Sequence, residues 1–481
     1  GWLTVAIHGP NAVNAQTVAG SPIVWVELGP SGAVIARVIT TDMTCPHMTL
    51  GSTTESMQVR AQPSPPDYPV LVCEATIPSG VASASVGGQA LPLPKPSPSR
   101  IVVIGDAGCR ISADKVQACN DPQAWPFERV ANSAAAFQPD LVIHVGDLLY
   151  REEACPVGNA GCVGSPFGYN FAAMNADFFT PAAALLRAAP WVFTRGNHEL
   201  CSRNGAAWFR LFDPRPMPAN CQDFTDPYAI AAGDIQLLLF DSSIANDLEA
   251  QPDQVAIYAP QFAALHNLAQ GDAWLLTHRP MWSFGHAGIK DGVEELFRDN
   301  PTLQAASQNA LPSHVQLVLS GHIHLLELLS FSGGRPPQFV VGNSGTLLDP
   351  TITTPLPGLE IAGATVTTGP VIGQFGFLTM ERSGRDWIVT ARDVNGAPQF
   401  TCTLSGAGLT CLPVPVIPTV TPHLLVLVAA GFLVFMTLAI RRQQSPTGPY
   451  ELSRRLSDRQ EHLSPRDRHS RITNRLITRV N

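Results

Sequence analysis

Five short apolar runs in the middle of the chain each end in residues that could bind metal ions. The runs lead into Gly105-Asp-Ala-Gly, Gly146-Asp-Leu-Leu-Tyr, Gly196-Asn-His-Glu, His278 and Gly321-His-Ile-His. Asp, Asn, His and Tyr supply the oxygen and nitrogen donors that first-row metals bind. Because sites in open α/β sheets form at the carboxyl ends of strands, five such ends would bring these donors together.

Each motif alone is a weak indicator. A Gly-Asp pair after a strand is usually a turn, and a single His at a strand end is more often structural, which is how we interpret His144. Alternating positions can place His322 and His324 on one side of an extended segment. The whole ordered set is hard to obtain by accident, so it predicts a metal centre.

The runs before these motifs predict buried strands with helices between them. The predicted strands are residues 101–104, 141–145, 191–194, 235–240, 273–277 and 315–319, and the predicted helices are residues 126–137, 171–186 and 292–308. This alternation predicts an α/β domain. Beyond residue 336, the runs 339–342, 375–382, 386–393 and 399–404 predict a terminal antiparallel portion.

Residues 1–93 predict a small all-β accessory domain. Its β-branched and apolar runs are residues 23–28, 33–40, 70–73 and 82–86, and glycines and prolines separate the first two. The proline-rich residues 94–100 predict a stiff linker to the domain that follows.

The C-terminal part predicts a membrane anchor. After a Pro/Val/Thr spacer at 412–423, residues 424–440 are apolar and uncharged, and Arg441-Arg442 follow. A run of about 17 residues is at the short end of the membrane-spanning range. The positive-inside rule places the Arg-rich tail, residues 441–481, in the cytoplasm and the body outside. A buried core helix and a C-terminal sorting signal are the alternatives.

The ten cysteines fall into close pairs along the chain. The pairs are Cys45 with Cys73, Cys109 with Cys119, Cys155 with Cys162, Cys201 with Cys221, and Cys402 with Cys411. Even number and local pairing favour disulfides in an oxidising compartment over a zinc cluster, although sequence alone leaves the connectivity open. The chain starts with Gly, so we expect a removed signal peptide and a periplasmic or cell-surface body.

The charge of the chain does not favour nucleic acid as a partner. The formal net charge is −8, although the residues from Arg441 onward carry ten Arg against four acidic residues. An acidic body does not favour nucleic acid, which binds to basic faces. The chain also lacks a Gly-Lys-[Ser/Thr] P-loop and a Gly-x-Ser-x-Gly elbow.

In their order and intervals, the five motifs resemble the purple acid phosphatase branch of the calcineurin-like metallophosphoesterases. The resemblance covers residues 101–342, and only Leu275 departs from it, standing where the family has Val. It implies an α+β sandwich of two mixed β-sheets flanked by helices, in a catalytic domain over residues 101–411.

The resemblance also implies two metal sites that share Asp147. The first site would hold Fe(III) and the second a divalent Fe, Zn or Mn ion, because phenolate and carboxylates are hard donors whereas amide and imidazoles are neutral. The first would be formed by Asp106, Tyr150, His324 and Asp147, and the second by Asn197, His278, His322 and Asp147.

The implied activity is acid phosphatase-like hydrolysis of a small phosphate monoester or diester by a metal-bound hydroxide. His198 matches the family histidine that contacts phosphate and protonates the leaving group. His286, eight residues after His278, matches a second substrate-facing histidine only in approximate spacing.

Two other functions fit the sequence. One is a colourless Mn or Zn phosphodiesterase of the same superfamily, in which Tyr150 would not bind metal. The other is a surface binding protein that keeps the fold without turnover, although such proteins usually lose ligands and all seven expected positions are filled here.

Overall fold

The computed structural model describes residues 21–308 and 310–413. The predicted membrane helix at 424–440 and the tail at 441–481 lie outside the described residues. No helix within the described ranges has the length and apolar character needed to cross a membrane.

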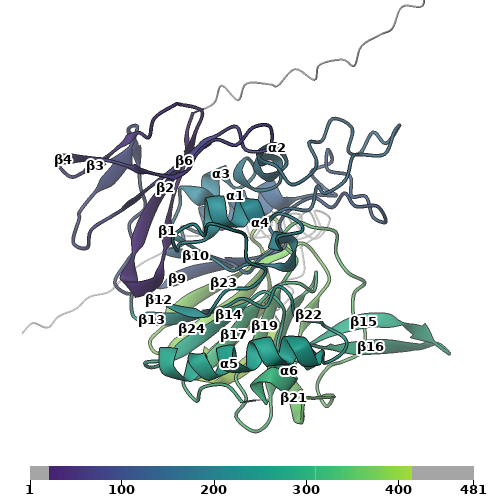
Figure 1. The fold of residues 1–481 in the computed structure, drawn as a ribbon. Helices are drawn as coiled ribbons and strands as arrows, with labels where there is room; N and C mark the ends of the chain where they lie inside the picture. Colours follow the sequence, from purple (N-terminus) through teal and green to yellow (C-terminus); the bar gives the residue numbers. More distant parts are fainter. Residues whose placement is uncertain (1–20, 309, 414–481) are drawn as a thin grey trace, which may run out of the picture. The chain divides into compact units, whose positions relative to one another are not determined.

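Two large β-sheets pack face to face and carry helices on their outer faces (Figure 1). The first sheet has eleven strands, in the order β26-β25-β24-β23-β9-β10-β11-β1-β2-β6-β5. Its strands are β1 (Ile23–Leu28), β2 (Val34–Thr40), β5 (Gln58–Ala61), β6 (Leu71–Thr76), β9 (Arg100–Ile104), β10 (Leu141–His144), β11 (Trp191–Phe193), β23 (Gly376–Ser383), β24 (Asp386–Asp393), β25 (Pro398–Ser405) and β26 (Gly408–Pro413).

The second sheet has nine strands, in the order β12-β13-β14-β17-β19-β18-β21-β20, with β22 also paired to β18. They are β12 (Tyr228–Ala232), β13 (Ile235–Phe240), β14 (Ala273–Thr277), β17 (Val315–Ser320), β18 (Leu326–Phe331), β19 (Gln338–Val341), β20 (Glu360–Ile361), β21 (Ala364–Thr368) and β22 (Val371–Ile372). Two small sheets contain β3 (His47–Leu50), β4 (Thr53–Ser56), β7 (Ala84–Val86) and β8 (Gln89–Ala90), and the hairpin β15 (Ser283–Lys290) and β16 (Val293–Asp299).

Helices cover the outer faces because the central strands are apolar on both sides. On β9, Ile101 and Val103 pack between the two sheets, whereas Val102 and Ile104 pack against the helices. The α-helices are α1 (Phe127–Ala136), α2 (Phe171–Met174), α3 (Ala183–Leu186), α4 (Gly205–Ala207), α5 (Pro252–Leu268) and α6 (Pro301–Ser307). There are also two 3-10 turns, η1 (Pro30–Gly32) and η3 (Asn197–Glu199), and two π-helical segments, η2 (Asn175–Phe179) and η4 (Trp208–Phe212). The two mixed sheets flanked by helices agree with the predicted fold class.

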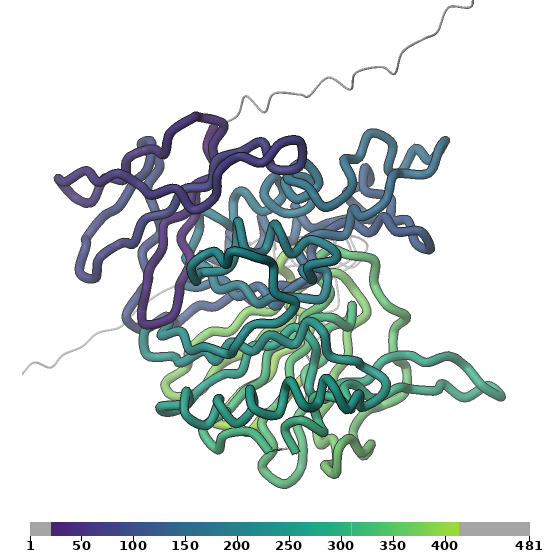
Figure 2. The backbone as a smooth tube through the Cα atoms, in the orientation of Figure 1, coloured from purple at the N-terminus to yellow at the C-terminus, as the bar shows by residue number. Residues whose placement is uncertain are grey.

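The N-terminal strands continue the sheet that carries the metal-ligand motifs. Strand β1 pairs in parallel with β11, with Glu27 opposite Trp191, and β2, β6 and β5 extend the sheet from there. Figure 2 shows this purple segment beside the blue and teal part of the chain. The eleven-stranded sheet therefore contains strands from both sides of the proline-rich residues 94–100.

The predicted helix over 292–308 is wrong in its first half. Residues Val293–Asp299 form strand β16, which pairs with β15 after a turn at Gly292. The helix begins only at Pro301, where the side chain of Asn300 accepts the Leu303 amide as an N-cap. The predicted helix over 171–186 is broken into α2, η2 and α3, and α5 was not predicted.

All five predicted cysteine pairs form disulfides. They join Cys45 to Cys73, Cys109 to Cys119, Cys155 to Cys162, Cys201 to Cys221, and Cys402 to Cys411. No free cysteine occurs within the described ranges, which contain all ten. The zinc-cluster alternative is therefore excluded for these residues.

Candidate metal centre

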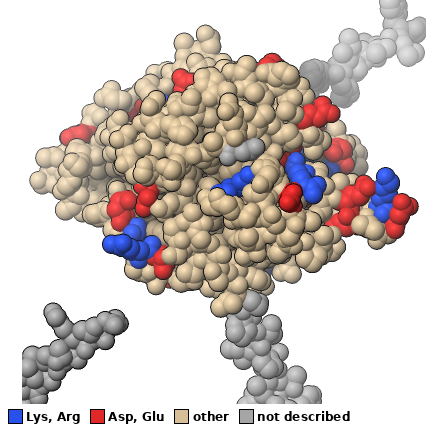
Figure 3. Space-filling view, turned by 90° about the horizontal axis from the view of Figure 1, so that it is seen from below, with Lys and Arg blue, Asp and Glu red and all other residues tan. Residues whose placement is uncertain are grey.

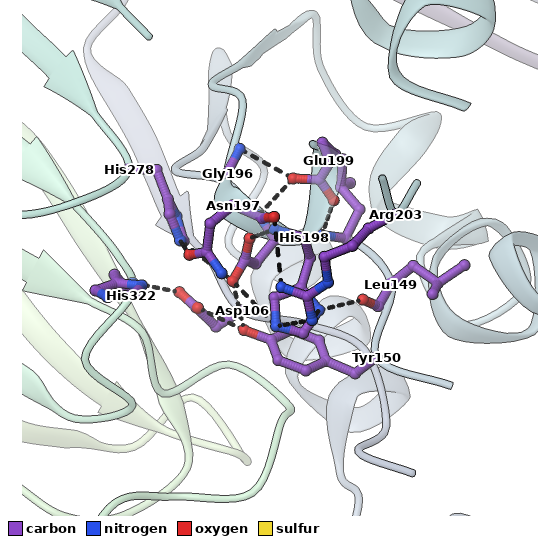
Figure 4. A network of polar contacts seen from close by, with 12 residues as sticks. Asp106, Leu149, Tyr150, Gly196, Asn197, His198, Glu199, Arg203, His278 and His322 are labelled. Atoms are coloured by element: carbon purple, nitrogen blue, oxygen red, sulfur yellow. Dashed lines mark hydrogen bonds and ion pairs between the residues drawn. The ribbon is translucent and has the colours of Figure 1, made fainter. Parts of the chain in front are cut away.

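The five motifs meet where their strands end. Strands β9, β10 and β11 run parallel in the first sheet, and β14 and β17 run parallel in the second, so their carboxyl ends lie at one edge of each sheet. Side chains from both sheets point toward one another there (Figure 4). The predicted arrangement of the strand ends is confirmed.

The backbone at this edge is strained at ligand positions. Asp106, Asp147 and His322 have positive φ values of 53°, 59° and 75°. Such a conformation costs on the order of 1–3 kcal/mol for a non-glycine residue and persists only where the surroundings impose it. Gly196 approaches Asp147 so closely that a Cβ atom would collide with the carboxylate. The strain therefore accompanies three of the seven predicted ligands.

Tyr150 is the centre of the first donor group. Its hydroxyl oxygen lies 2.8 Å from Asp106 Oδ1 and 2.9 Å from Asp147 Oδ2, either of which can accept its single proton, and 3.1 Å from His324 Nε2. The ring is buried, and so are both carboxylates. These four side chains are the predicted first metal site.

Asp147 also belongs to the second donor group. Its Oδ2 lies 3.2 Å from His278 Nε2, which in turn lies 3.1 Å from Asn197 Oδ1. Donor atoms of Asp147, His278 and His322 all lie within 4.8 Å of one another, a spacing that suits a common metal ion. A single carboxylate oxygen thus contacts both groups, as a bridging ligand would.

The imidazoles are oriented for metal binding. His278 Nδ1 donates to the Val145 carbonyl at 2.8 Å, and His324 Nδ1 donates to the Leu347 carbonyl at 2.9 Å. Each bond leaves Nε2 as the free lone pair, directed at the donor group. His322 is reversed, since its Nε2 lies 3.0 Å from Asp247 Oδ2 and Nδ1 remains for a metal.

The charges of the site favour a cation. Burial opposes ionisation, but His278 and His198 hold the pKa of Asp147 well below its usual range. Burial alone would lower the pKa of His278, whereas Asp147 raises it to about 9. Without metal a proton is therefore held between these two groups, and a bound metal ion would replace it.

Glu199 holds the loops that carry the ligands. Its two carboxylate oxygens accept the amides of Asp147, Leu148 and Gly196 at 2.8–3.1 Å. Burial, followed by the charge of Asp147, raises the pKa of Glu199 to about 7. Glu199 therefore fixes the turns after β10 and β11 relative to each other.

His198 lies beside the donor groups without joining them. Its amide donates to Asp147 Oδ1 at 2.8 Å, and its ring centroid lies 3.9 Å from that of Tyr150. Nδ1 donates to the Leu149 carbonyl at 2.9 Å, so Nε2 faces the site, 3.8 Å from Asp147 Oδ2. This placement suits a proton donor to a ligand bound by the metals.

The residues fit two metal ions. The fit rests on a carboxylate oxygen common to two donor groups, on imidazoles whose other nitrogen is already bonded, and on positive φ values at three of the ligand positions. The first group is anionic and oxygen-rich, and the second is mainly neutral nitrogen and amide oxygen. The structure brings all seven predicted ligands together.

His286 is the predicted site residue that the structure does not link to the others. It lies on β15, where Nδ1 contacts Glu294 Oε1 of β16 at 3.0 Å. No hydrogen bond or ion pair joins it to a predicted ligand within residues 21–308 and 310–413. Its role stays a prediction.

Sequence reasoning missed four charged residues that surround the ligands. Glu152 and Arg203 contact His198, and Asp247 and Arg279 contact His322. Only Arg279 carried a signal, since it directly follows His278. The other three come from loops whose approach to the site depends on the fold.

Comparisons with known proteins agree with this geometry. Residues 99–326 match the family model of the calcineurin-like phosphoesterases, which confirms the resemblance for this domain. No curated protein sequence matches the chain.

Solved structures show a similar fold. A purple acid phosphatase from yellow lupin (Lupinus luteus) seeds is 14% identical, with a TM-score of 0.54 over 80% of this chain and 74% of the other. The structure of PhoD is 11% identical, with a TM-score of 0.53 over 84% of this chain and 95% of the other. At these identities the likeness concerns the fold alone.

Proposed function

We propose that the chain is a binuclear-metal phosphoesterase that hydrolyses small phosphate monoesters. The observation that carries this proposal is the position of Asp147, whose Oδ2 contacts both donor groups at 2.9 and 3.2 Å. The calcineurin-like phosphoesterase match supports a hydrolase that uses a dimetal centre. On the face drawn in Figure 3, the described charged side chains form small mixed groups rather than a basic area, which does not favour nucleic acid as a partner of that face.

Tyr150 decides the kind of metal centre. Burial and the carboxylate of Asp106 raise the pKa of its phenol well above the usual range, so only a strongly Lewis-acidic ion would bind it as phenolate. We assign Fe(III) to the Tyr150 group and a divalent ion to the His278 group. The same pKa shift favours the second candidate, a colourless phosphodiesterase in which Tyr150 stays a phenol.

The residues around the metals have separate tasks. Two bound metal ions would neutralise charge on the phosphoryl group and lower the pKa of water. His198 presents Nε2 to the site because Leu149 accepts its other nitrogen, and it would protonate the leaving oxygen. Glu199 holds the turns of Asp147 and Gly196 so that these groups keep their spacing.

We further propose that this site faces an oxidising compartment. Five disulfides support that location, because they persist outside the reducing cytosol. The proposed membrane anchor at 424–440 would place the body outside the cytoplasm.

The decisive experiment combines metal analysis, a visible spectrum and assays on one sample of residues 1–412. We expect two metal ions per chain, a visible charge-transfer band and monoesterase activity. Bound metal with phosphodiesterase activity but no band would establish the colourless alternative, and metal without turnover would leave a binding protein. His198→Ala should lower turnover about 10²- to 10⁴-fold while both metals stay bound; metal loss would make His198 a ligand.

A further inference from the structure

Arg203 lies at the edge of the candidate metal centre without a role in the proposed metal binding. Its Nη2 is 2.9 Å from His198 Nε2, the nitrogen that faces Asp147 (Figure 4). The arginine side chain is 23% exposed, whereas the ligands Asp147 and His278 are buried. Arg203 is therefore a cation that both solvent and a ligand in the site could reach.

A rigid loop places this arginine. The amide of Arg203 donates to the Leu200 carbonyl at 2.9 Å, and the amide of Asn204 donates to the His198 carbonyl at 3.0 Å. The disulfide from Cys201 to Cys221 closes the same loop. The backbone of Arg203 is thus fixed to the turn that carries His198.

Glu152 orients the guanidinium. Its Oε1 accepts Arg203 Nε at 2.7 Å and the Tyr169 hydroxyl at 3.3 Å, and it lies 3.3 Å from His198 Nδ1. One carboxylate oxygen therefore aligns the arginine and the histidine. A guanidinium carries five N–H donors. Glu152 and the Asn197 carbonyl accept some of them, and His198 in its protonated, proton-donating form would accept none, so donors remain for a ligand.

We propose that Arg203 binds a phosphoryl oxygen of the substrate, with Glu152 as the residue that positions it. The inference rests on the proposed phosphoesterase function, and it adds a protein-borne anion contact to the metal ions. Arginine is suited to this because its planar donors match phosphate oxygens, and such charge-assisted hydrogen bonds are stronger than neutral ones. The alternative is that Arg203 only ties two loops together through Glu152.

A measurement of phosphate affinity distinguishes an Arg203 that binds phosphate from an Arg203 that only ties two loops together. Inorganic phosphate would be titrated by calorimetry into metal-loaded wild type, Arg203→Gln, Arg203→Lys and Arg215→Gln. Arg215 is a matched control, since it lies in the same disulfide loop, is 22% exposed and pairs with one carboxylate, Asp213. Metal content and thermal unfolding would be measured on every sample.

We expect Arg203→Gln to weaken phosphate binding about 10- to 100-fold, with a higher KM and unchanged metal content. Arg203→Lys should recover part of the affinity, and Arg215→Gln should match wild type. Equal phosphate affinity of Arg203→Gln and wild type would overturn the inference, and so would metal loss in Arg203→Gln.

Failure of the proposed function looks different. If wild type binds metal and phosphate but hydrolyses no phosphoester, the activity is wrong while the phosphate titrations still decide the role of Arg203. If metal-loaded wild type binds no phosphate, both proposals are wrong. Active wild type together with an unaffected Arg203→Gln variant would refute the arginine alone.

Discussion

Two clusters of polar and charged side chains in the described part of this molecule are balanced in different ways. The ligand cluster comprises Asp106, Asp147, Tyr150, Asn197, His278, His322 and His324. The arginine cluster comprises Glu27, Arg37, Arg60 and Glu74, on strands β1, β2, β5 and β6. The ligand cluster lies where strands of both large sheets end, whereas the arginine cluster lies on strands of the eleven-stranded sheet alone.

The arginine cluster neutralises itself. Arg37 Nη2 lies 2.7 Å from Glu27 and 2.8 Å from Glu74, and Arg60 Nη1 lies 2.9 Å from Glu74. Other guanidinium N–H groups of Arg37 and Arg60 donate to the backbone carbonyls of residues 209, 210, 211, 213 and 215. Two arginines thus balance two glutamates and attach the N-terminal strands to the segment that follows α4.

The ligand cluster combines converging donor groups with backbone strain. Asp106 and Asp147 lie 2.8 and 2.9 Å from one phenol oxygen, and three of the seven residues, Asp106, Asp147 and His322, have positive φ. Asp147 is paired with His278, whose proton a metal ion would replace. The four residues of the arginine cluster have no positive φ, although Arg60 lies at an irregularity in the pairing of β5 with β6. We therefore interpret the ligand cluster, in which metal-ligand side chains converge at strained positions, as a functional site, and the self-neutral arginine cluster as structural.

The strongest way to break this contrast is to remove the shared ligand. Asp147→Asn keeps a residue that tolerates positive φ but removes the bridging charge. We expect loss of at least one metal ion and an activity at least about a thousandfold lower, with little change in the free energy of unfolding of metal-free protein. Metal analysis and monoesterase assays test this, and full metal content would contradict the bridging role.

Substitution of the buried Arg37 should have the opposite effect, a loss of stability without a loss of activity. Arg37→Met leaves Glu27 buried without its partner, which should lower the free energy of unfolding by about 3–5 kcal/mol. Activity per folded molecule should stay unchanged. Urea unfolding measures the loss, and Arg37→Met with Glu27→Leu should recover part of it. A lower metal content in the single variant would show that the two clusters are coupled.

The free energy of unfolding should also depend on pH, with a smaller effect. Burial outweighs Arg37 and raises the pKa of Glu27 from 4.5 to about 7. The folded state then binds more protons than the unfolded state between these values, so this contribution is present below pH 4.5 and lost as pH rises to 7. We expect a decline on the order of 1 kcal/mol per pH unit, absent in Glu27→Gln. Parallel urea curves at several pH values test it, and equal slopes would disprove it.

The sequence predicted the ligand cluster because its residues follow strands at fixed offsets. A buried strand can be recognised in the sequence by its run of apolar residues. The Gly-Asp or Gly-x-His motif at its end directly follows that run in the chain. The arginine cluster has no such pattern, because Glu27 and Arg37 meet only through the pairing of β1 with β2. Their burial depends on packing that no local motif encodes.

Other features that the sequence did not predict also depend on contacts between distant segments. Residues 293–299 mix apolar and charged side chains in a way that fits helix and strand equally, and only pairing with β15 decides between them. Arg203 and Glu152 belong to separate disulfide-bearing loops, so their contact could not be predicted from spacing. The N-terminal strands were predicted, but they continue the eleven-stranded sheet only because β1 pairs in parallel with β11, which is distant in the sequence.

His286 offers the finest test of where the ligand cluster ends. It was predicted from spacing alone, and the structure bonds it to Glu294, which also accepts the amides of Thr353 and Thr354. A histidine held within a hairpin contributes less than one aimed at the site, so we expect His286→Ala to lower kcat/KM by less than about tenfold. His314→Ala, an exposed histidine, is the control. A loss as large as that of His198→Ala, with stability and metal content unchanged, would extend the catalytic site onto β15.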